Sequence, residues 1–426
     1  MRMIRLSARG KIQYQFLSLI VALLLLYGAG FLLDALLQLP ATPLSRHVDE
    51  ATVKVVTARC LSLALQTGLL GAGLAMASGA LSERTHRVAQ RLWIALIMAT
   101  LMASPFVRIN PLDAITALGL LALLALTRTA KDASAFFRVW QAGMLLLAAS
   151  LLAASVASWP WNQVLELFQW HVAYSIVTIS VAFWLMTRIS TVEREWAEDG
   201  VRIAAALLFF AGGLISIAPL GLPPLVGISA TPLILICYTI LAGHVYRALS
   251  LRNSDRSLAP HWTAVATLFW LLAGGFLGGL SLHAGLNQAL QNTALGAAQA
   301  WLLGWALLAV ICAYLNQVAV ELRGGNRRVT GYMPLWLIAF GAGLSTVVQA
   351  CRGVLEIYLR DGFALGPAQI REMTAPLTQL WIICLLAAAI GILILALGFW
   401  ARRPKIQVDS PASAPGGQKG ASSTLA

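Results

Sequence analysis

The chain has 426 residues, of which 59% are hydrophobic and only 11% are charged, and its mean hydropathy is +0.78. Because a soluble domain carries about 25% charged residues, this composition excludes an ordinary soluble enzyme or binding module. We expect an all-α, polytopic integral membrane protein in which residues 1–403 form one helical domain.

Twelve apolar segments of about membrane-spanning length follow one another along the chain. They lie at residues 16–39, 57–81, 88–106, 111–127, 137–158, 164–188, 203–218, 225–247, 261–283, 295–320, 331–351 and 376–400. We predict a transmembrane helix for each. The first is about a full span, so we do not expect a cleavable signal peptide. Residues 404–426 are rich in Ser, Ala, Gly and Pro and are predicted to be a disordered cytoplasmic tail.

The net charge of +13 reflects orientation in the membrane. If the N-terminus lies inside, every inner segment carries at least three Lys or Arg residues. The basic residues that fall outside are Arg46, Lys54, Arg59, Arg108, Arg352, Arg360 and Arg371. The positive-inside rule therefore predicts that both termini are cytoplasmic, and we do not expect nucleic-acid binding.

Cysteine and histidine patterns limit the metal chemistry. The five cysteines lie in or beside apolar runs without a CxxC or CxxCH motif, which predicts small hydrophobic side chains and no disulfide framework, zinc site or attached haem. His171 is the only histidine well inside a predicted span, and a metal ligand and a neutral histidine bonded to a neighbouring helix both explain it. The others are assigned to loops or to the ends of spans: His47, His86, His244, His261 and His283.

The segment at 295–320 is the predicted centre of the bundle, because Gln299 and Trp301 interrupt its apolar run. An unpaired amide in hydrocarbon is costly, so these side chains are expected to face the protein interior. Cofactor ligands would be expected at such positions, yet neither residue is a usual ligand. Residues predicted to line an enclosed cavity are Glu166, Gln169, Trp170, Tyr174 and Trp305.

Five stretches, in this order, carry a resemblance to a known family. They are Thr57-Ala58-Arg59-Cys60-Leu61-Ser62, Phe168-Gln169-Trp170-His171, Ala297-Ala298-Gln299-Ala300-Trp301, the segment 351–376 and Arg402-Arg403. The chain resembles subunit I of the haem–copper oxidase superfamily, and it is most similar to the large subunit of bacterial nitric oxide reductase and to the cbb3-type cytochrome c oxidase subunit I. The resemblance implies a twelve-helix fold in the bacterial inner (cytoplasmic) membrane, haem b with copper or non-haem iron, and electron transport in a respiratory chain.

The same resemblance implies that the haem ligands have been lost. The positions that ligate haem in the family are occupied here by Ser62, Gln299 and Trp301, and only His171 falls near a family metal ligand. The family's His-His pair is absent, since residues 216–221 read SIAPLG. Serine and tryptophan are not usual haem ligands and glutamine is a poor one. We therefore expect a degenerate haem site with no bound cofactor, in which tryptophans fill the volume that haem occupies in relatives.

Three functions follow as hypotheses, and they leave open whether the protein is an enzyme. The first is an accessory or structural subunit without a cofactor, which lies in the lipid bilayer beside a cytochrome c-type or other respiratory subunit. The second is an active oxygen- or nitric oxide-reducing subunit with unusual ligands. The third is a small-molecule transporter that uses the emptied cavity.

Overall fold

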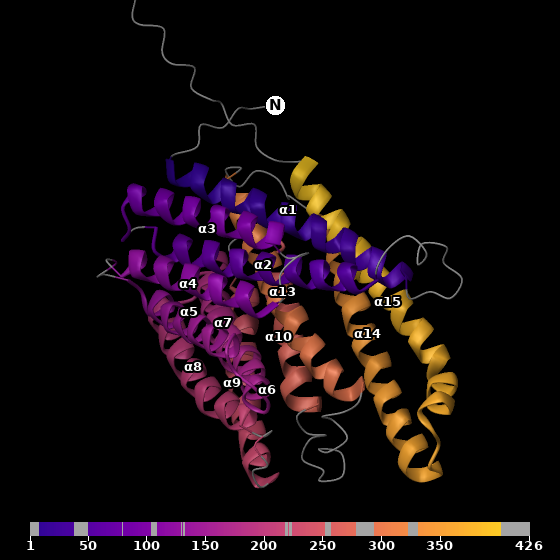
Figure 1. The fold of residues 1–426 in the computed structure, drawn as a ribbon. Coiled ribbons are helices and arrows are strands. Elements are labelled where there is room, and N and C mark those ends of the chain that lie inside the picture. The colour runs from indigo at the N-terminus through magenta and orange to yellow at the C-terminus, as the bar shows by residue number, and fades with distance from the viewer. Residues whose placement is uncertain are drawn as a thin grey trace, which may run out of the picture.

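In the part of the chain that the structure describes, the helices of the computed structural model form twelve rods that run back and forth through one bundle (Figure 1). The structure describes residues 8–37, 50–78, 80–103, 109–128, 130, 133–217, 220, 224–251, 257–277, 294–322 and 331–401. The predicted tail at 404–426 and the side chain of Gln299 lie outside this part.

Each predicted span coincides with a helix. The helices are α1 (Ala8–Leu37), α2 (Glu50–Met76), α3 (Glu83–Ala103), α4 (Ile109–Thr127), α5 (Ala135–Ala154), α6 (Trp161–Phe168), α7 (Ser175–Ile189), α8 (Arg194–Ser216), α9 (Pro224–Ser250), α10 (Ala259–Leu271), α13 (Ala294–Leu322), α14 (Tyr332–Ile357) and α15 (Pro367–Ala401). Three π-helical turns continue these rods: η2 (Gln169–Tyr174) joins α6 to α7, η4 (Leu272–Leu277) extends α10, and η5 (Tyr358–Gly362) extends α14. The all-α prediction is confirmed.

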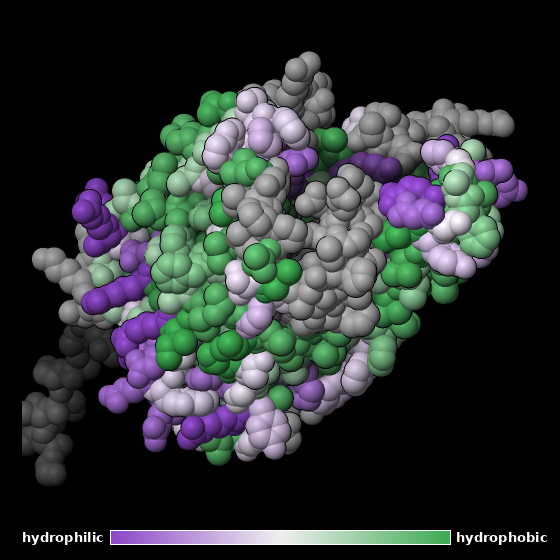
Figure 2. All heavy atoms as spheres, turned by 90° about the horizontal axis from the view of Figure 1, so that it is seen from below, coloured by the Kyte–Doolittle hydropathy of each residue, from purple (hydrophilic) through white to green (hydrophobic). Residues whose placement is uncertain are grey.

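Nine helices in the described part are long and apolar enough to cross a membrane. Helix α4 contributes a shorter apolar stretch, Leu112–Thr127, and the N-terminal end of α3 carries three arginines. Figure 2 shows a largely hydrophobic face with hydrophilic side chains gathered toward opposite edges. The chain is therefore a multi-pass membrane protein. The start of α1 and the end of α15 both lie toward the top of Figure 1, while the direction of insertion stays a prediction.

Three rods form the centre of the bundle. The fraction of residues buried within the protein is 94% for the apolar window of α13, 83% for the rod from α6 to α7 and 72% for α2. The equivalent fraction for α8 is 39%, so that helix faces lipid along much of its length. The prediction that the 295–320 segment is central is confirmed.

Two tryptophans fix α2 against its neighbours through hydrogen bonds. The Trp93 indole on α3 donates to the Thr67 hydroxyl at 3.0 Å, and the Trp140 indole on α5 donates to the Leu69 carbonyl at 2.9 Å. Gly73 leaves room for the Trp140 ring, because a β-carbon there would overlap it. Large rings can thus be buried in this part of the bundle without leaving their N–H groups unpaired.

The first and last helices are neighbours. Helices α14 and α15 pack closely, because Gly341 has no side chain and a β-carbon there would lie 2.7 Å from the Ala388 backbone nitrogen. On the other side of α15, Leu393 packs against Gly28 of α1. The C-terminal helix is therefore held between α14 and the N-terminal helix (Figure 1).

One histidine assigned to a solvated loop is buried instead. His86 lies in the first turn of α3 and is 4% exposed. Its ring nitrogens lie 3.1 Å from the Ser82 carbonyl oxygen and 3.2 Å from the Leu74 carbonyl oxygen. The prediction was wrong because α3 begins earlier than the apolar run indicates. Ser82 caps the start of the helix, where its hydroxyl accepts a hydrogen bond from the Thr85 backbone N–H.

Candidate functional site

A buried ion pair connects α2 to α4. The Arg59 guanidinium donates to Asp113 Oδ1 at 2.8 Å, and the two side chains are 8% and 25% exposed. Sequence analysis assigned Arg59 to an outer segment, but α2 begins at Glu50, so Arg59 lies nine residues inside the helix. Ionisable side chains in a transmembrane helix are rare, and their partners mark functional sites by default.

Further along the same face of α2, a second polar group reaches η2. Gln66 donates through Nε2 to the Tyr174 hydroxyl at 3.1 Å and to the Ser62 hydroxyl at 3.3 Å. Gln66 is 2% exposed, and its carbonyl oxygen Oε1 is buried with no hydrogen-bond partner in the described structure. Positions 59, 62 and 66 share one helix face through their three- and four-residue spacings. We refer to Arg59, Ser62, Gln66, Asp113 and Tyr174 as the α2 polar cluster.

The π-helical turn η2 gives Tyr174 its position. A π-helix bonds each N–H to a carbonyl five residues back, so entering and leaving it frees carbonyl oxygens from their usual partners. The Ser175 hydroxyl donates to the Trp170 carbonyl at 2.8 Å, which satisfies one of them. The Trp170 and Tyr174 rings lie 5.2 Å apart, so the same turn places an aromatic pair beside Gln66.

His171 lies in η2 but does not form part of a metal site that the structure describes. It is 7% exposed, and its carbonyl oxygen would lie 2.7 Å from a β-carbon on Gly212, so α8 approaches its backbone closely. No group of three or more His, Cys, Asp or Glu side chains suited to a metal ion occurs among the described residues. The assignment of His171 as a ligand stays a prediction.

A separate aromatic cluster joins α1, α13 and α15. The Trp301 ring lies 6.1 Å from Phe31, 6.0 Å from Trp305 and 6.5 Å from Trp381, measured between ring centroids. Tyr27 stacks on Phe31 at 5.4 Å. These separations are typical of favourable aromatic pairs. Phe31 and Trp305 are buried, and the Trp305 Nε1 donor has no partner within the described residues. We refer to these five residues as the aromatic cluster.

Ser62 and Trp301, two of the positions that the resemblance aligns with haem ligands, do not fit a haem iron. An axial ligand needs a free lone pair on imidazole, thiolate or thioether, aimed from a facing helix. Trp301 offers an indole ring packed against three other rings, and the Ser62 hydroxyl already accepts from Gln66.

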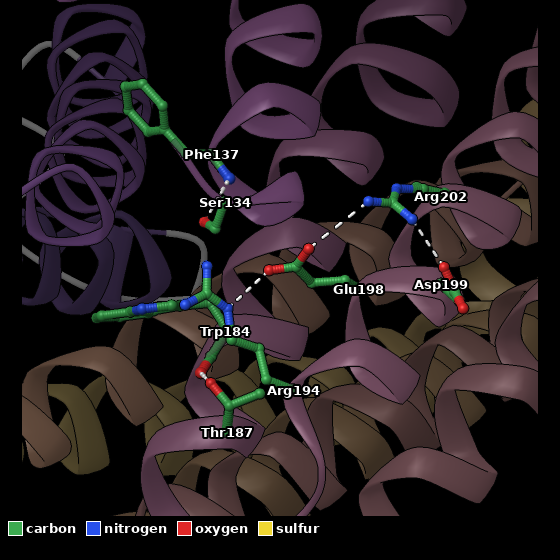
Figure 3. A network of polar contacts seen from close by, with 8 residues as sticks. All are labelled: Ser134, Phe137, Trp184, Thr187, Arg194, Glu198, Asp199 and Arg202. Atoms are coloured by element: carbon green, nitrogen blue, oxygen red, sulfur yellow. Dashed lines mark hydrogen bonds and ion pairs between the residues drawn. The ribbon is translucent and has the colours of Figure 1, made fainter. Parts of the chain in front are cut away.

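Polar groups at the other end of the bundle have a structural role. Figure 3 shows Glu198 of α8 between Arg194, at 2.8 Å, and Arg202, at 3.6 Å, with Arg202 also bonded to Asp199 at 2.7 Å. In the same view the Ser134 hydroxyl accepts from the Phe137 backbone N–H at the start of α5. The arginines are exposed, and exposed ion pairs contribute little.

His244, predicted to lie at a membrane interface, is enclosed by aromatic rings. Its ring stacks on Trp196 at 3.6 Å, meets Phe183 edge-on at 4.7 Å, and shares a hydrogen bond of 2.8 Å with the Ile240 carbonyl. The Arg247 guanidinium lies over the Trp196 ring, with its Cζ atom 4.5 Å from the ring centroid. These contacts pack His244 between α7, α8 and α9.

Three of the five residues predicted to line a cavity lie in or beside the two clusters, and the other two do not. Trp170 and Tyr174 lie beside the α2 polar cluster and Trp305 lies in the aromatic cluster, while Gln169 is half-buried and Glu166 is exposed on α6. Sequence analysis missed Arg59, Gln66 and Asp113. The signal for Arg59 and Gln66 is the 59, 62, 66 spacing on one face of α2, which the predicted span 57–81 already contains, whereas no local pattern pairs Asp113 with Arg59.

No protein-family model matches this chain, and no curated protein matches it either.

Proposed function

We propose that the chain is a membrane subunit without a resident cofactor, related to subunit I of the haem–copper oxidase superfamily, and that it serves as an accessory or structural component of a respiratory complex in the bacterial cytoplasmic membrane. The observation that supports this is the aromatic cluster. Trp301, at a family ligand position, packs against Phe31, Trp305 and Trp381. Aromatic packing of this kind supplies stability where relatives would need an iron ligand.

In a bundle without a cofactor, aromatic side chains that fill the volume of the haem would stabilise the fold. A void as large as a porphyrin would destabilise the bundle, because residual cavity volume costs about 24 cal/mol per Å³. Three bulky rings around Trp301 remove this penalty. A cytochrome c-type or other respiratory membrane subunit is the partner that the family resemblance implies.

The test is a visible difference spectrum, reduced minus oxidised, of the detergent-purified protein together with a pyridine haemochrome assay. The protein is expressed with haem supply intact, and a known haem membrane protein prepared in parallel serves as the control. We expect a flat spectrum and co-purification with another membrane subunit. Haem in stoichiometric amount, lost in His171→Ala, would instead support the active-enzyme alternative.

A second candidate function, a small-molecule transporter, is favoured by the α2 polar cluster. Ionisable and amide groups inside the protein mark solute pathways in many transporters. Gln66 and Tyr174 lie on the buried rods α2 and η2, so a route along α2 would pass them. Solute uptake into proteoliposomes that is abolished by Gln66→Leu but unchanged by Gln317→Leu would support transport. The second variant removes a glutamine near the other end of the bundle.

A further inference from the structure

The α2 polar cluster has more hydrogen-bond donors and acceptors than the described residues pair. The buried Gln66 Oε1 accepts nothing, and within the described part of the chain the Arg59 side chain forms one hydrogen bond out of its five N–H donors. Each unsatisfied polar group in a membrane interior costs several kcal/mol, so such groups are normally satisfied by protein or by a water-filled cavity.

Exposure differs within the cluster: Asp113 and Ser62 are partly exposed, while Arg59, Gln66 and Tyr174 are buried. Asp113, in the first turns of α4, is 25% exposed, the Arg59 side chain is 8% exposed, and Gln66 is 2% exposed. The candidate span of α2 begins at Thr52, so Arg59 lies about 10 Å and Gln66 about 21 Å along the helix from that end, at 1.5 Å per residue. The polar groups thus extend from one end of α2 and α4 to the middle of the membrane.

Aromatic rings lie at the end of the polar cluster that is deepest in the bundle. Tyr174 bonds to Gln66 and packs against Trp170 at 5.2 Å between centroids, and the next turns of α2 are buried and apolar, with Leu69 at 0% exposure. Beyond Tyr174, α2 offers only the Thr67 hydroxyl, which already accepts from Trp93.

We propose that the α2 polar cluster is the inner end of a hydrated recess, open on the side where α2 and α4 begin, which binds small uncharged solutes carrying both a hydrogen-bond donor and an acceptor. The Arg59–Asp113 pair is neutral overall, so it does not select for a net charge on the bound solute. Gln66 Oε1 accepts the solute's O–H or N–H group, and the free Arg59 donors bind its oxygen. This inference goes beyond the accessory role, and it does not require that a solute crosses the membrane.

Cysteine labelling tests the recess directly. The parent variant is Cys351→Ala, because the other four cysteines are buried and Cys351 is exposed. Ser62→Cys in this parent is nearly isosteric, and Leu63→Cys is its matched control, since Leu63 is 0% exposed on the same turn. Charged, membrane-impermeant methanethiosulfonate reagents are added separately to each side of sealed vesicles. The wild-type Cys351, at the end of α14, reports which side the reagent has reached.

We expect Ser62→Cys to react from one side only, and the parent and Leu63→Cys to remain unlabelled. Because the Arg59–Asp113 pair is neutral overall, the sulfonate and trimethylammonium reagents should label Ser62→Cys at similar rates. Asp113→Asn, which leaves the Arg59 charge unpaired, should make the sulfonate reagent the faster of the two. Glycerol, as an uncharged probe solute with donors and acceptors, should slow the labelling of Ser62→Cys.

The opposite result is equally clear. If Ser62→Cys is as unreactive as Leu63→Cys while wild-type Cys351 reacts, the cluster is dry and the inference is wrong. Gln66→Cys provides the same readout if Ser62→Cys does not fold. Labelling without solute flux would refute the transporter candidate but support a closed recess. Haem content does not affect this assay, so the accessory role is tested independently.

Discussion

Removing Asp113 should destabilise the protein because it leaves a charge without its partner. The variant Asp113→Ala deprives the Arg59 guanidinium of the carboxylate that lies 2.8 Å away. Breaking a buried ion pair costs 3–5 kcal/mol. Asp113 is 25% exposed and keeps part of its hydration, so we expect a loss near the lower limit, about 3 kcal/mol in the free energy of unfolding.

A double-mutant cycle isolates this interaction. Arg59→Met retains the packing of the side-chain stem, and the double variant Arg59→Met/Asp113→Ala contains no unpaired charge. We therefore expect the double variant to be more stable than Asp113→Ala, with a coupling energy of about 2 kcal/mol between the two sites. Equilibrium unfolding in mixed micelles, followed by fluorescence of the 14 tryptophans, measures all four free energies.

The chain supplies a control pair of the same length. Arg202 and Asp199 lie 2.7 Å apart, but their side chains are 59% and 68% exposed. The corresponding cycle should give less than about 1 kcal/mol, because exposed pairs are screened by solvent. Equal coupling energies for the two pairs would refute the claim that burial gives Arg59–Asp113 its strength.

Three further changes have defined outcomes in the same unfolding assay. Ser175→Ala should lower the free energy of unfolding by about 1–2 kcal/mol, since the Trp170 carbonyl in η2 loses its donor. Ser175→Thr keeps a hydroxyl and should retain most of the stability. Equal losses in the two variants would exclude the hydrogen bond as the cause. Trp301→Ala should lower the free energy of unfolding by about 2–3 kcal/mol, because it leaves a partly relaxed cavity, and Trp301→Phe should lower it clearly less. Unchanged stability in Trp301→Ala would show that the aromatic cluster is loosely packed. Gly341→Ala should cost about 1–3 kcal/mol, because its β-carbon would lie 2.7 Å from the Ala388 nitrogen; unchanged stability would mean that α14 and α15 separate easily.

Helix positions were predictable because the membrane imposes them. A span needs about 20 apolar residues whatever its neighbours are, so segments such as 137–158 were placed within a few residues of the observed helix Ala135–Ala154. Helix ends were less predictable. Polar residues continue α2 as far as Glu50, where backbone hydrogen bonding and not hydrophobicity sets the boundary.

The candidate site was less accessible to sequence reasoning. Gln66 and Tyr174 are 108 residues apart in the chain, and no local pattern pairs them. Their contact also depends on η2, because a π-helical turn changes the direction of the side chains that follow it. Tyr174 was singled out from its place beside His171, whereas Gln66 lies in a run that reads as an ordinary apolar helix.

The contact between α1 and α15 has a consequence for biogenesis. The Gly28 face of α1 receives its protein partner, Leu393, only after α15 has been made. During translation that face must be covered by lipid or by insertion machinery. A chain that stops before α15 would therefore leave the Gly28 face of α1 and the Gly341 face of α14 uncovered by protein, and we expect it to be a target for quality-control proteases.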